Sequence, residues 1–176
     1  MKKTFFTVAI LFAVATLFSF TLPDAWRIAS KYNISFSTSG VSGIFKSFTG
    51  DIIFNEQNLA TSKFDIAIDI NSINTGNGMQ NKHAKGEDWF DASKYPAIKF
   101  TSTKIAKAAN GYLATGNLQL HGVTKGVNLP FLFKGNGNGG TFEGSFNINR
   151  NDFKIGTPGG EVGDVIKVSV KIPVTK

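Results

Sequence analysis

Residues 64–70 read Phe-Asp-Ile-Ala-Ile-Asp-Ile, the clearest alternating pattern in the chain. Large apolar residues occupy every second position, and Asp65, Ala67 and Asp69 stand between them. Successive side chains of a strand point to opposite faces of a sheet, so this pattern places the apolar residues on one face. The stretch therefore predicts a β-strand that covers an apolar interior with one face.

The same period of two recurs along most of the chain. Turn residues separate the runs: Asn110-Gly111 fits a tight hairpin, a Gly/Asn loop fills residues 135–140, and Gly159-Gly160 precedes the last run. Together the runs predict an all-β fold of about eight antiparallel strands. They centre on residues 34–36, 52–54, 64–70, 98–100, 112–120, 127–133, 142–148 and 168–174.

One segment lacks this period. Residues 79–89 show no alternation and predict a short helical insert, limited by Gly86 and by the Gly76-Asn77-Gly78 start. Strands with one apolar face each and one short helix leave two architectures, a sandwich and a closed barrel. Closure removes exposed sheet edges, and eight strands can enclose a small ligand.

Charge placement indicates which face is inside. In an outer-membrane barrel the apolar face would point to lipid and the polar face to the lumen. The two Trp residues of this chain form no aromatic girdle, and we expect the apolar face to turn inward. The polar positions include charged residues that a narrow lumen would have to pack: Asp65, Asp69, Glu143, Lys167 and Lys171.

The N-terminal residues have the layout of a secretory signal. A basic start over residues 1–4 precedes an almost wholly apolar run over residues 5–20. A bilayer span needs about 20 apolar residues, so a signal peptide is favoured over an anchor. We expect a signal peptide over residues 1–20, with its cleavage site open, a barrel domain over residues 21–176, and a periplasmic or secreted protein.

Composition limits the partners. The formal net charge is +7, with two of the lysines in the leader, and the remaining lysines are scattered. Because no dense basic run occurs, we expect no nucleic-acid binding, and at most transient contact with a membrane surface. The chain has no Cys, so its core must hold the fold without disulfides. A monomer and a homodimer both stay open.

Motifs for catalysis, metals and cofactors are absent from the sequence. Gly135, Gly137 and Gly140 match a dinucleotide fingerprint by letters, but a strand pattern follows where that motif needs a helix. His83 and His121 belong to no zinc-binding pattern, and no serine has the surroundings of a nucleophile. We therefore expect no metal, no cofactor and no enzymatic activity.

Several segments of the chain form an ordered set. The most specific is residues 116–125, GNLQLHGVTK, and another is residues 89–96, WFDASKYP. The others are residues 26–36, 43–52, 72–75, 100–103, 148–153 and 162–165, with His83 in the insert. In this order, from Trp26 to the end, the chain resembles the YceI-like family of lipid- or polyisoprenoid-binding proteins of bacterial envelopes.

The resemblance implies an eight-stranded antiparallel lipocalin-like barrel with a helix near one opening. It also implies an isoprenoid or similar long lipid held along the barrel axis. From the apolar interior and this resemblance we expect a long-chain isoprenoid lipid, a polyisoprenoid or an isoprenoid quinone, held for carriage or storage. The family usually has an Arg-Asp pair and a Leu around the helix His, whereas this chain has Asn81, Lys82 and Ala84. The departure changes the residues that could meet a head group near His83.

The site expected from alternation and resemblance is an apolar lumen with a polar rim. Arg150 is expected to pair with Asp152 or Asp164, or to meet a head group. Two alternatives stay open: a stress-related or scaffold barrel with a packed interior, and a lipid-modifying enzyme with a polar cluster at the rim. The lumen candidates are Phe36, Phe64, Ile66, Ile68, Phe100, Leu118, Leu120, Phe131, Phe133, Phe146, Val170 and Ile172; the rim candidates are His83, His121 and Arg150.

Overall fold

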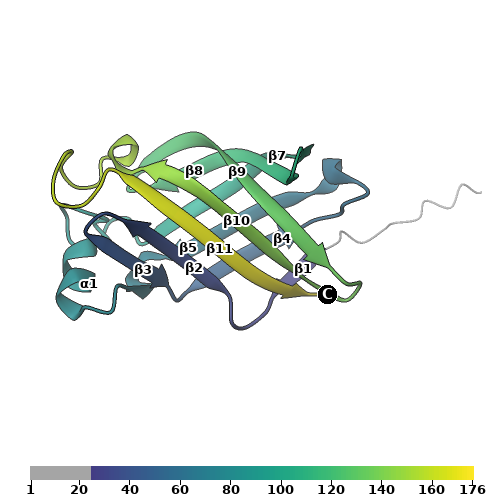
Figure 1. Ribbon diagram of the computed structural model, residues 1–176, viewed down its shortest axis with the longest axis horizontal. Coiled ribbons are helices and arrows are strands. Elements are labelled where there is room, and N and C mark those ends of the chain that lie inside the picture. Colours follow the sequence, from purple (N-terminus) through teal and green to yellow (C-terminus); the bar gives the residue numbers. More distant parts are fainter. Residues whose placement is uncertain (1–24) are drawn as a thin grey trace, which may run out of the picture.

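A single antiparallel sheet closes on itself in the computed structural model, which describes residues 25–176 (Figure 1). The expected signal peptide lies outside these residues. Among them, no helix has the length and apolar character needed to cross a membrane. The strands are β1 (Ala25–Ile28), β2 (Asn33–Thr38), β3 (Val41–Phe45), β4 (Phe48–Ile53), β5 (Lys63–Asp69), β6 (Ile73–Asn74), β7 (Ala97–Ala108), β8 (Gly111–Leu120), β9 (Val123–Gly135), β10 (Gly139–Asn149) and β11 (Val165–Thr175). The helices are η1 (Leu59–Thr61), η2 (Ile70–Ser72), α1 (Gly78–Ala84) and η3 (Arg150–Phe153).

The strands occupy eight positions around a barrel. The order β1-β4-β5-β7-β8-β9-β10-β11 closes because β11 also pairs with β1. The short strands β2, β3 and β6 prolong β1, β4 and β5, since β11 pairs with β1 at Val174 and with β2 from Lys171 to Lys167. The antiparallel eight-stranded barrel expected from the sequence is confirmed.

The breaks in these prolonged strands were not visible in the alternation. One lies between β1 and β2, where Lys31 takes a positive φ of 69°. Tyr32 bridges a second break, between β3 and β4: its hydroxyl donates to the Lys46 carbonyl at 2.9 Å and accepts from the Phe48 N–H at 3.0 Å. The Tyr32 hydroxyl thus pairs with two backbone groups that flank the second break.

The helical insert is confirmed, but it is shorter than residues 79–89. The Asn77 side chain caps α1 by accepting from the N–H groups of Met79 and Gln80. The helix ends at Ala84, and the Gly86 N–H then turns back to the His83 carbonyl at 2.9 Å. The following residues form turns that lead to β7 at the same end of the barrel (Figure 1).

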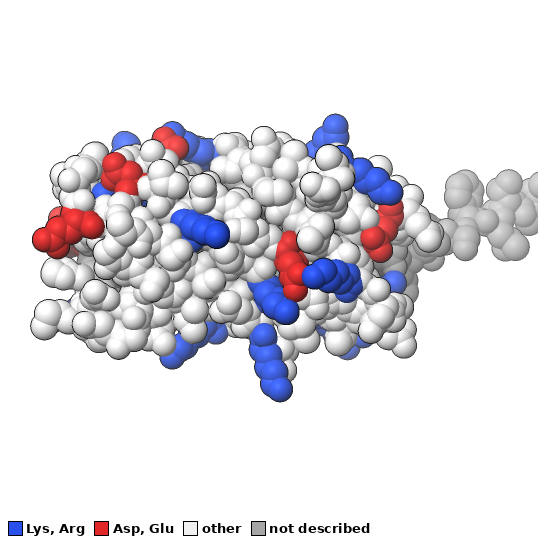
Figure 2. Space-filling view, in the orientation of Figure 1, with Lys and Arg blue, Asp and Glu red and all other residues white. Residues whose placement is uncertain are grey.

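Charged side chains lie on the outside of the barrel, as their placement in the sequence predicted. Asp65, Asp69, Lys167 and Lys171 are exposed, and Glu143 lies between two lysines on the outer surface. Figure 2 shows acidic and basic side chains dispersed over one face of the molecule. The loop over residues 135–140 joins β9 to β10 as a hairpin, so the dinucleotide motif is a match by letters alone.

Candidate functional site

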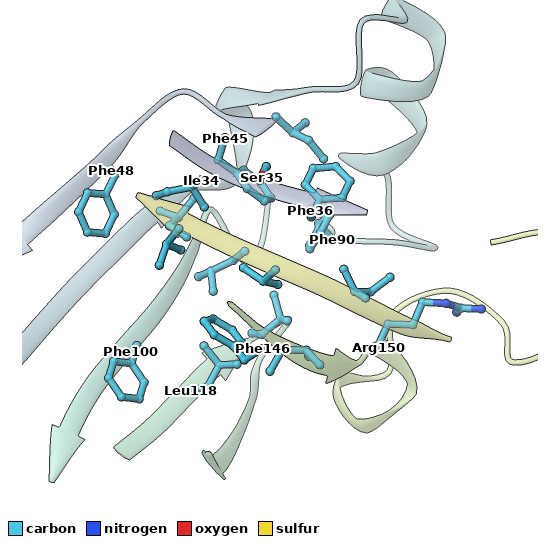
Figure 3. Close-up of a pocket in the computed structure, with 18 of the residues that line it drawn as sticks. Ile34, Ser35, Phe36, Phe45, Phe48, Phe90, Phe100, Leu118, Phe146 and Arg150 are labelled. Carbon is cyan, nitrogen blue, oxygen red and sulfur yellow. The ribbon is translucent and has the colours of Figure 1, made fainter. Parts of the chain in front are cut away.

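A cavity of about 580 Å³ occupies one half of the barrel interior, at the end that carries α1 (Figure 3). Its wall is built from the inward faces of several strands, for example Ile66 and Ile68 of β5, Phe146 of β10, and Val168 and Val170 of β11. These inward side chains are only half-buried. The volume is within the range of ligand cavities, roughly 300–1,000 Å³.

The opposite half of the interior is filled by aromatic rings. Phe54, which is 1% exposed, lies at the centre of this cluster. Its ring lies 5.0 Å from that of Tyr112 and 5.1 Å from that of Phe133, both edge-on. The Trp26 indole N–H donates to the Phe54 carbonyl at 2.9 Å and fixes the cluster to β1. The other rings in contact with Phe54 are those of Phe64, Phe131 and Phe142. The cavity therefore ends against packed aromatic side chains.

The helix α1 and the turns after it form the mouth. Phe45 joins the wall to these turns, because its ring lies 5.5 Å from Phe36 and 6.2 Å from Phe90. The polar residues that line the cavity are Ser35, Thr75, Gln80, His83, Arg150 and Glu161. The site therefore offers a large apolar surface with a few polar groups at one end, an arrangement that suits an amphipathic ligand.

Two of the residues around His83 shape this mouth. Asn81 ties α1 to the strand end, since its side-chain oxygen accepts from the N–H of Thr75 at 2.8 Å and from its hydroxyl at 2.9 Å. Ala84 lines the cavity with a single methyl group, and Lys82 is exposed. The helix is therefore anchored by a polar contact, and it narrows the mouth little.

Arg150 is a structural hub at the rim. It is 3% exposed, and its Nη2 lies 2.7 Å from Asp164, whereas Asp152 pairs with Lys125 at 3.1 Å. The guanidinium also lies 5.5 Å above the Trp89 ring, and Figure 3 shows the side chain extending away from the other labelled residues. Nη2 also donates to the carbonyls of Thr157 and Val162, Nη1 donates to that of Ile155, and Nε to that of Gly163, at 2.7–3.2 Å. All three guanidinium nitrogens are thus bonded to the loop over residues 155–164, and the side chain holds this loop in place.

The structure brings most of the predicted lumen residues together. Every lumen candidate except Phe133 lines the cavity. Phe133 belongs to the packed half, where its ring lies 5.2 Å from Trp26 and 4.6 Å from Phe142. Whether the lining residues touch a ligand stays a prediction.

The rim candidates do not form one cluster. His83 is exposed on α1 and lines the cavity mouth. His121 lies in the β8–β9 hairpin, with Nδ1 3.1 Å from the Phe153 carbonyl and its ring 5.1 Å from that of Tyr95, and it does not line the cavity. Arg150 lines the cavity, but its guanidinium is bonded to Asp164 and to carbonyls of the loop over residues 155–164.

Several lining residues were not among the predicted lumen residues, and they differ in how well the sequence could have indicated them. Ile98, Ile148 and Val168 extend the inward faces of strands that were already predicted, and the period of two could have found them. Trp89 and Phe90 lie in turns, where no periodicity signals an inward side chain.

Comparison with known proteins places this barrel in a family. Residues 26–174 match the family model of the YceI-like domain. A UPF0312 protein of Vibrio campbellii is 35% identical over 170 residues, which are 88% of this chain and 89% of the relative. A UPF0312 protein of Yersinia enterocolitica is 36% identical over 140 residues, 76% of this chain and 73% of the relative.

Solved structures share the architecture. BcnA of Burkholderia cenocepacia superposes with a TM-score of 0.80 at 30% identity, over 85% of this chain and 100% of that one. A polyisoprenoid binding domain from Saccharophagus degradans superposes with a TM-score of 0.65 over 88% of this chain and 99% of that one. At 16% identity, the second match shows the fold alone.

Proposed function

The chain belongs to the YceI-like family, and from that premise we propose that it is an exported, non-enzymatic protein that holds a long apolar lipid for carriage or storage. The observation that carries this proposal is the apolar cavity of about 580 Å³ that opens near α1 and ends against the aromatic cluster. The polyisoprenoid binding domain of Saccharophagus degradans, which has the same fold, supports an isoprenoid chain as the ligand.

The physical basis is transfer of hydrocarbon out of water. Each CH₂ group removed from water contributes about 0.8 kcal/mol, so a long chain gains most of its affinity without directed contacts. The cavity wall of isoleucine, valine and phenylalanine side chains provides the apolar environment that such a chain needs. The tail points to the aromatic end, and the head group stays at the mouth, where the polar residues lie. Binding of this kind needs no catalytic group.

The charges at the mouth favour an uncharged head group. A diphosphate needs several free N–H donors or cations. The Arg150 guanidinium already donates to the surrounding carbonyls and to Asp164, and Glu161 brings a negative charge to the lining. The side chains of Gln80 and His83 line the mouth and can hydrogen-bond an alcohol or a quinone carbonyl, whereas the Thr75 hydroxyl is already bonded to Asn81. The ligand class is therefore a neutral isoprenoid, a polyprenol or an isoprenoid quinone.

Two observations weigh against the alternatives of a packed scaffold and a lipid-modifying enzyme. The interior contains a cavity that is large enough for a ligand. The three polar rim candidates do not converge on one point in it, because His121 and Arg150 are engaged with backbone carbonyls.

Organic extraction and mass spectrometry of the purified protein test the proposal. We expect a neutral isoprenoid lipid at roughly one per chain, because a single cavity holds the tail. An extract without lipid, from a protein that also fails to take up added polyprenol, would contradict the proposed function.

Competition between polyprenol and polyprenyl diphosphate tests the head group. We expect the wild type to bind polyprenol more tightly than the diphosphate. Glu161→Lys should improve binding of the diphosphate and leave polyprenol unchanged, because it reverses a charge at the mouth. Glu87→Lys is the matched control, since Glu87 is exposed and does not line the cavity. Tighter binding of the diphosphate by the wild type would overturn the neutral head group.

A further inference from the structure

The ladder between β9 and β10 stops halfway along the barrel. Residues 131–135 of β9 pair with residues 140–144 of β10. Beyond this point, toward the α1 end, residues 123–130 pair with β8 and residues 145–149 pair with β11. Within the described part of the chain, no pairing joins these two stretches, and we call the gap between them the seam.

Polar side chains connect β9 to β10 where the two strands are paired, but not across the seam. Where the ladder is formed, Lys134 of β9 reaches Glu143 of β10 at 2.6 Å. Beyond it, Asn128 accepts from the Thr115 hydroxyl of β8 at 2.8 Å. Ser145 lies 3.3 Å from the Ser169 hydroxyl of β11. Asn128 and Ser145, the polar residues nearest the point where the ladder stops, are thus hydrogen-bonded to the strands behind the seam and not across it.

The seam opens into the cavity. Leu129 and Pro130 of β9 and Phe146 and Ile148 of β10 all line the cavity, and Pro130 is also exposed at the surface. A cavity wall that is at the same time exposed marks a place where the interior meets the outside.

Both ends of the seam are fixed. At the inner end, the last pair of the ladder joins Gly144 to Phe131. The backbone of β10 comes close to that of β9 there, since a Cβ atom on Gly144 would lie 2.9 Å from the Pro130 carbonyl oxygen, and glycine permits this approach. Proline has no N–H for a ladder, which suits a strand that becomes an edge. At the outer end, η3 crosses from β10 to the β8–β9 hairpin, held by Lys125–Asp152 at 3.1 Å and by His121 against the Phe153 carbonyl at 3.1 Å.

A second gap in the barrel, between β5 and β7, is closed in a different way. There β7 continues past its last pair with β5, at Thr101. The Ser102 hydroxyl accepts from the Phe64 N–H at 2.8 Å, and η1 packs against β7 with Leu59 on the core. That gap is sealed by a hydrogen bond and a covering helix, whereas the seam has apolar side chains on its borders.

We propose that the seam is a side opening of the cavity, a slot formed by Leu129, Pro130, Phe146 and Ile148 that binds and passes the apolar chain of the ligand. It rests on the proposed function. A chain too long for the cavity can leave through the slot while its head group stays at the mouth. The slot thus defines a second apolar subsite, and the chain length that the protein accepts is not limited by the cavity volume.

Two outward positions on either side of β11 provide a matched test. Asn147 of β10 and Ser37 of β2 both pair with Lys167, and both are exposed. Asn147 borders the seam, whereas Ser37 has a paired strand on each side, because it also pairs with Ser42. Since the chain has no native Cys, Asn147→Cys and Ser37→Cys can each carry one bulky label through a reducible disulfide.

The measurement is the rate at which diphenylhexatriene, an apolar fluorescent probe, enters the cavity. We expect the label on N147C to slow association by about fivefold or more, the label on S37C to change it by less than about twofold, and a reductant to restore the rate. Equal rates for the two labelled variants would overturn the side opening alone. Absence of probe binding in both unlabelled variants would overturn the proposed function, and the side opening with it.

Discussion

The two halves of this barrel interior are built on the same alternation but differ in what fills them. On β11, Ile172 and Val174 are 4% and 2% exposed, whereas Val168 and Val170 on the same face are half-buried. Val174 belongs to the core and does not line the cavity, whereas Ile172, which pairs with Phe142, lines the cavity where it meets the aromatic cluster. Val168 and Val170 line the cavity farther from that cluster. Alternation therefore determines which face of a strand turns inward. The size of the side chains on neighbouring strands determines whether the interior is filled.

Each half is also stabilised in its own way. The packed half has rings in contact around Phe54, so its stability comes from apolar burial. The open half encloses the cavity, and its rim is held by the Arg150 hub and by the capped helix α1. Substitutions in the two halves should therefore affect stability and ligand binding differently.

The largest effect is expected for Phe54→Ala in the packed half. Removing this ring should lower the free energy of unfolding by about 3–5 kcal/mol, because it leaves a cavity among rings that cannot all move in. Phe146→Ala in the open half is the counterpart. It should lower the free energy of unfolding by only about 1–2 kcal/mol, since its ring already borders a cavity. Denaturant unfolding of both variants measures the contrast, and equal losses would show that the halves do not differ in packing.

A smaller effect is expected for Arg150→Lys at the rim. Lysine cannot reproduce the planar set of donors, so buried carbonyls lose partners and the free energy of unfolding should fall by about 2–3 kcal/mol. Arg27→Lys makes the same change at an exposed position and should have little effect. A stability of the Arg150 variant equal to that of the Arg27 variant would contradict the structural role of the hub.

Alkaline pH should weaken the packed half through Tyr112. The hydrogen bond to Glu56, at 2.6 Å, together with burial, raises the pKa of Tyr112 from 10.0 to about 12. The fold therefore favours the neutral phenol, and this stabilisation is complete below pH 10 and is lost as the pH rises toward 12. Unfolding curves between those pH values should show a smaller loss of stability for Tyr112→Phe than for the wild type. Tyr95→Phe is the control for removal of a tyrosine, and an identical loss in both variants would argue against the Tyr112–Glu56 contact.

The smallest effect is expected for Glu143→Gln on the outer surface. Lys134 and Lys171 beside the carboxylate lower the pKa of Glu143, so its contribution is present at neutral pH and is lost as the pH falls through that lowered pKa. The carboxylate lies on the outer surface beside two exposed lysines, and solvent screens such pairs. Thermal unfolding at neutral pH should barely distinguish this variant from Glu87→Gln. A large loss would show that the cross-strand ion pairs hold β9 against β10 more strongly than exposed pairs do.

Particular residues show how far the sequence could predict the structure. The period of two around Phe64, Ile66 and Ile68 predicted both the strand and its inward face, because strand geometry is local. The same period predicted that Phe133 faces the barrel interior, and it does. The period could not show that Phe133 packs in the aromatic cluster and does not line the cavity. Filling depends on contacts between strands that are distant in the sequence, such as Phe133 with Trp26.

The polar rim was harder to predict. The pairing of Arg150 with Asp164 was one of the alternatives drawn from the sequence, but its carbonyl partners depend on the path of an irregular loop. The seam could not be predicted at all, since both of its strands keep their alternation, and only the register shows that they separate. Pro130 beside the pairing limit was a sequence signal for an edge.

We propose that the open half of the barrel binds an apolar chain inside it. Titration of diphenylhexatriene into Val168→Trp and Lys167→Trp tests it most directly, because these neighbours on β11 face the cavity and the solvent, respectively. We expect Val168→Trp to weaken binding by about tenfold or more with little change in stability, because the indole fills the cavity, and Lys167→Trp to bind as the wild type does. Equal binding by the two variants would contradict the claim, since the probe would then be bound outside the cavity.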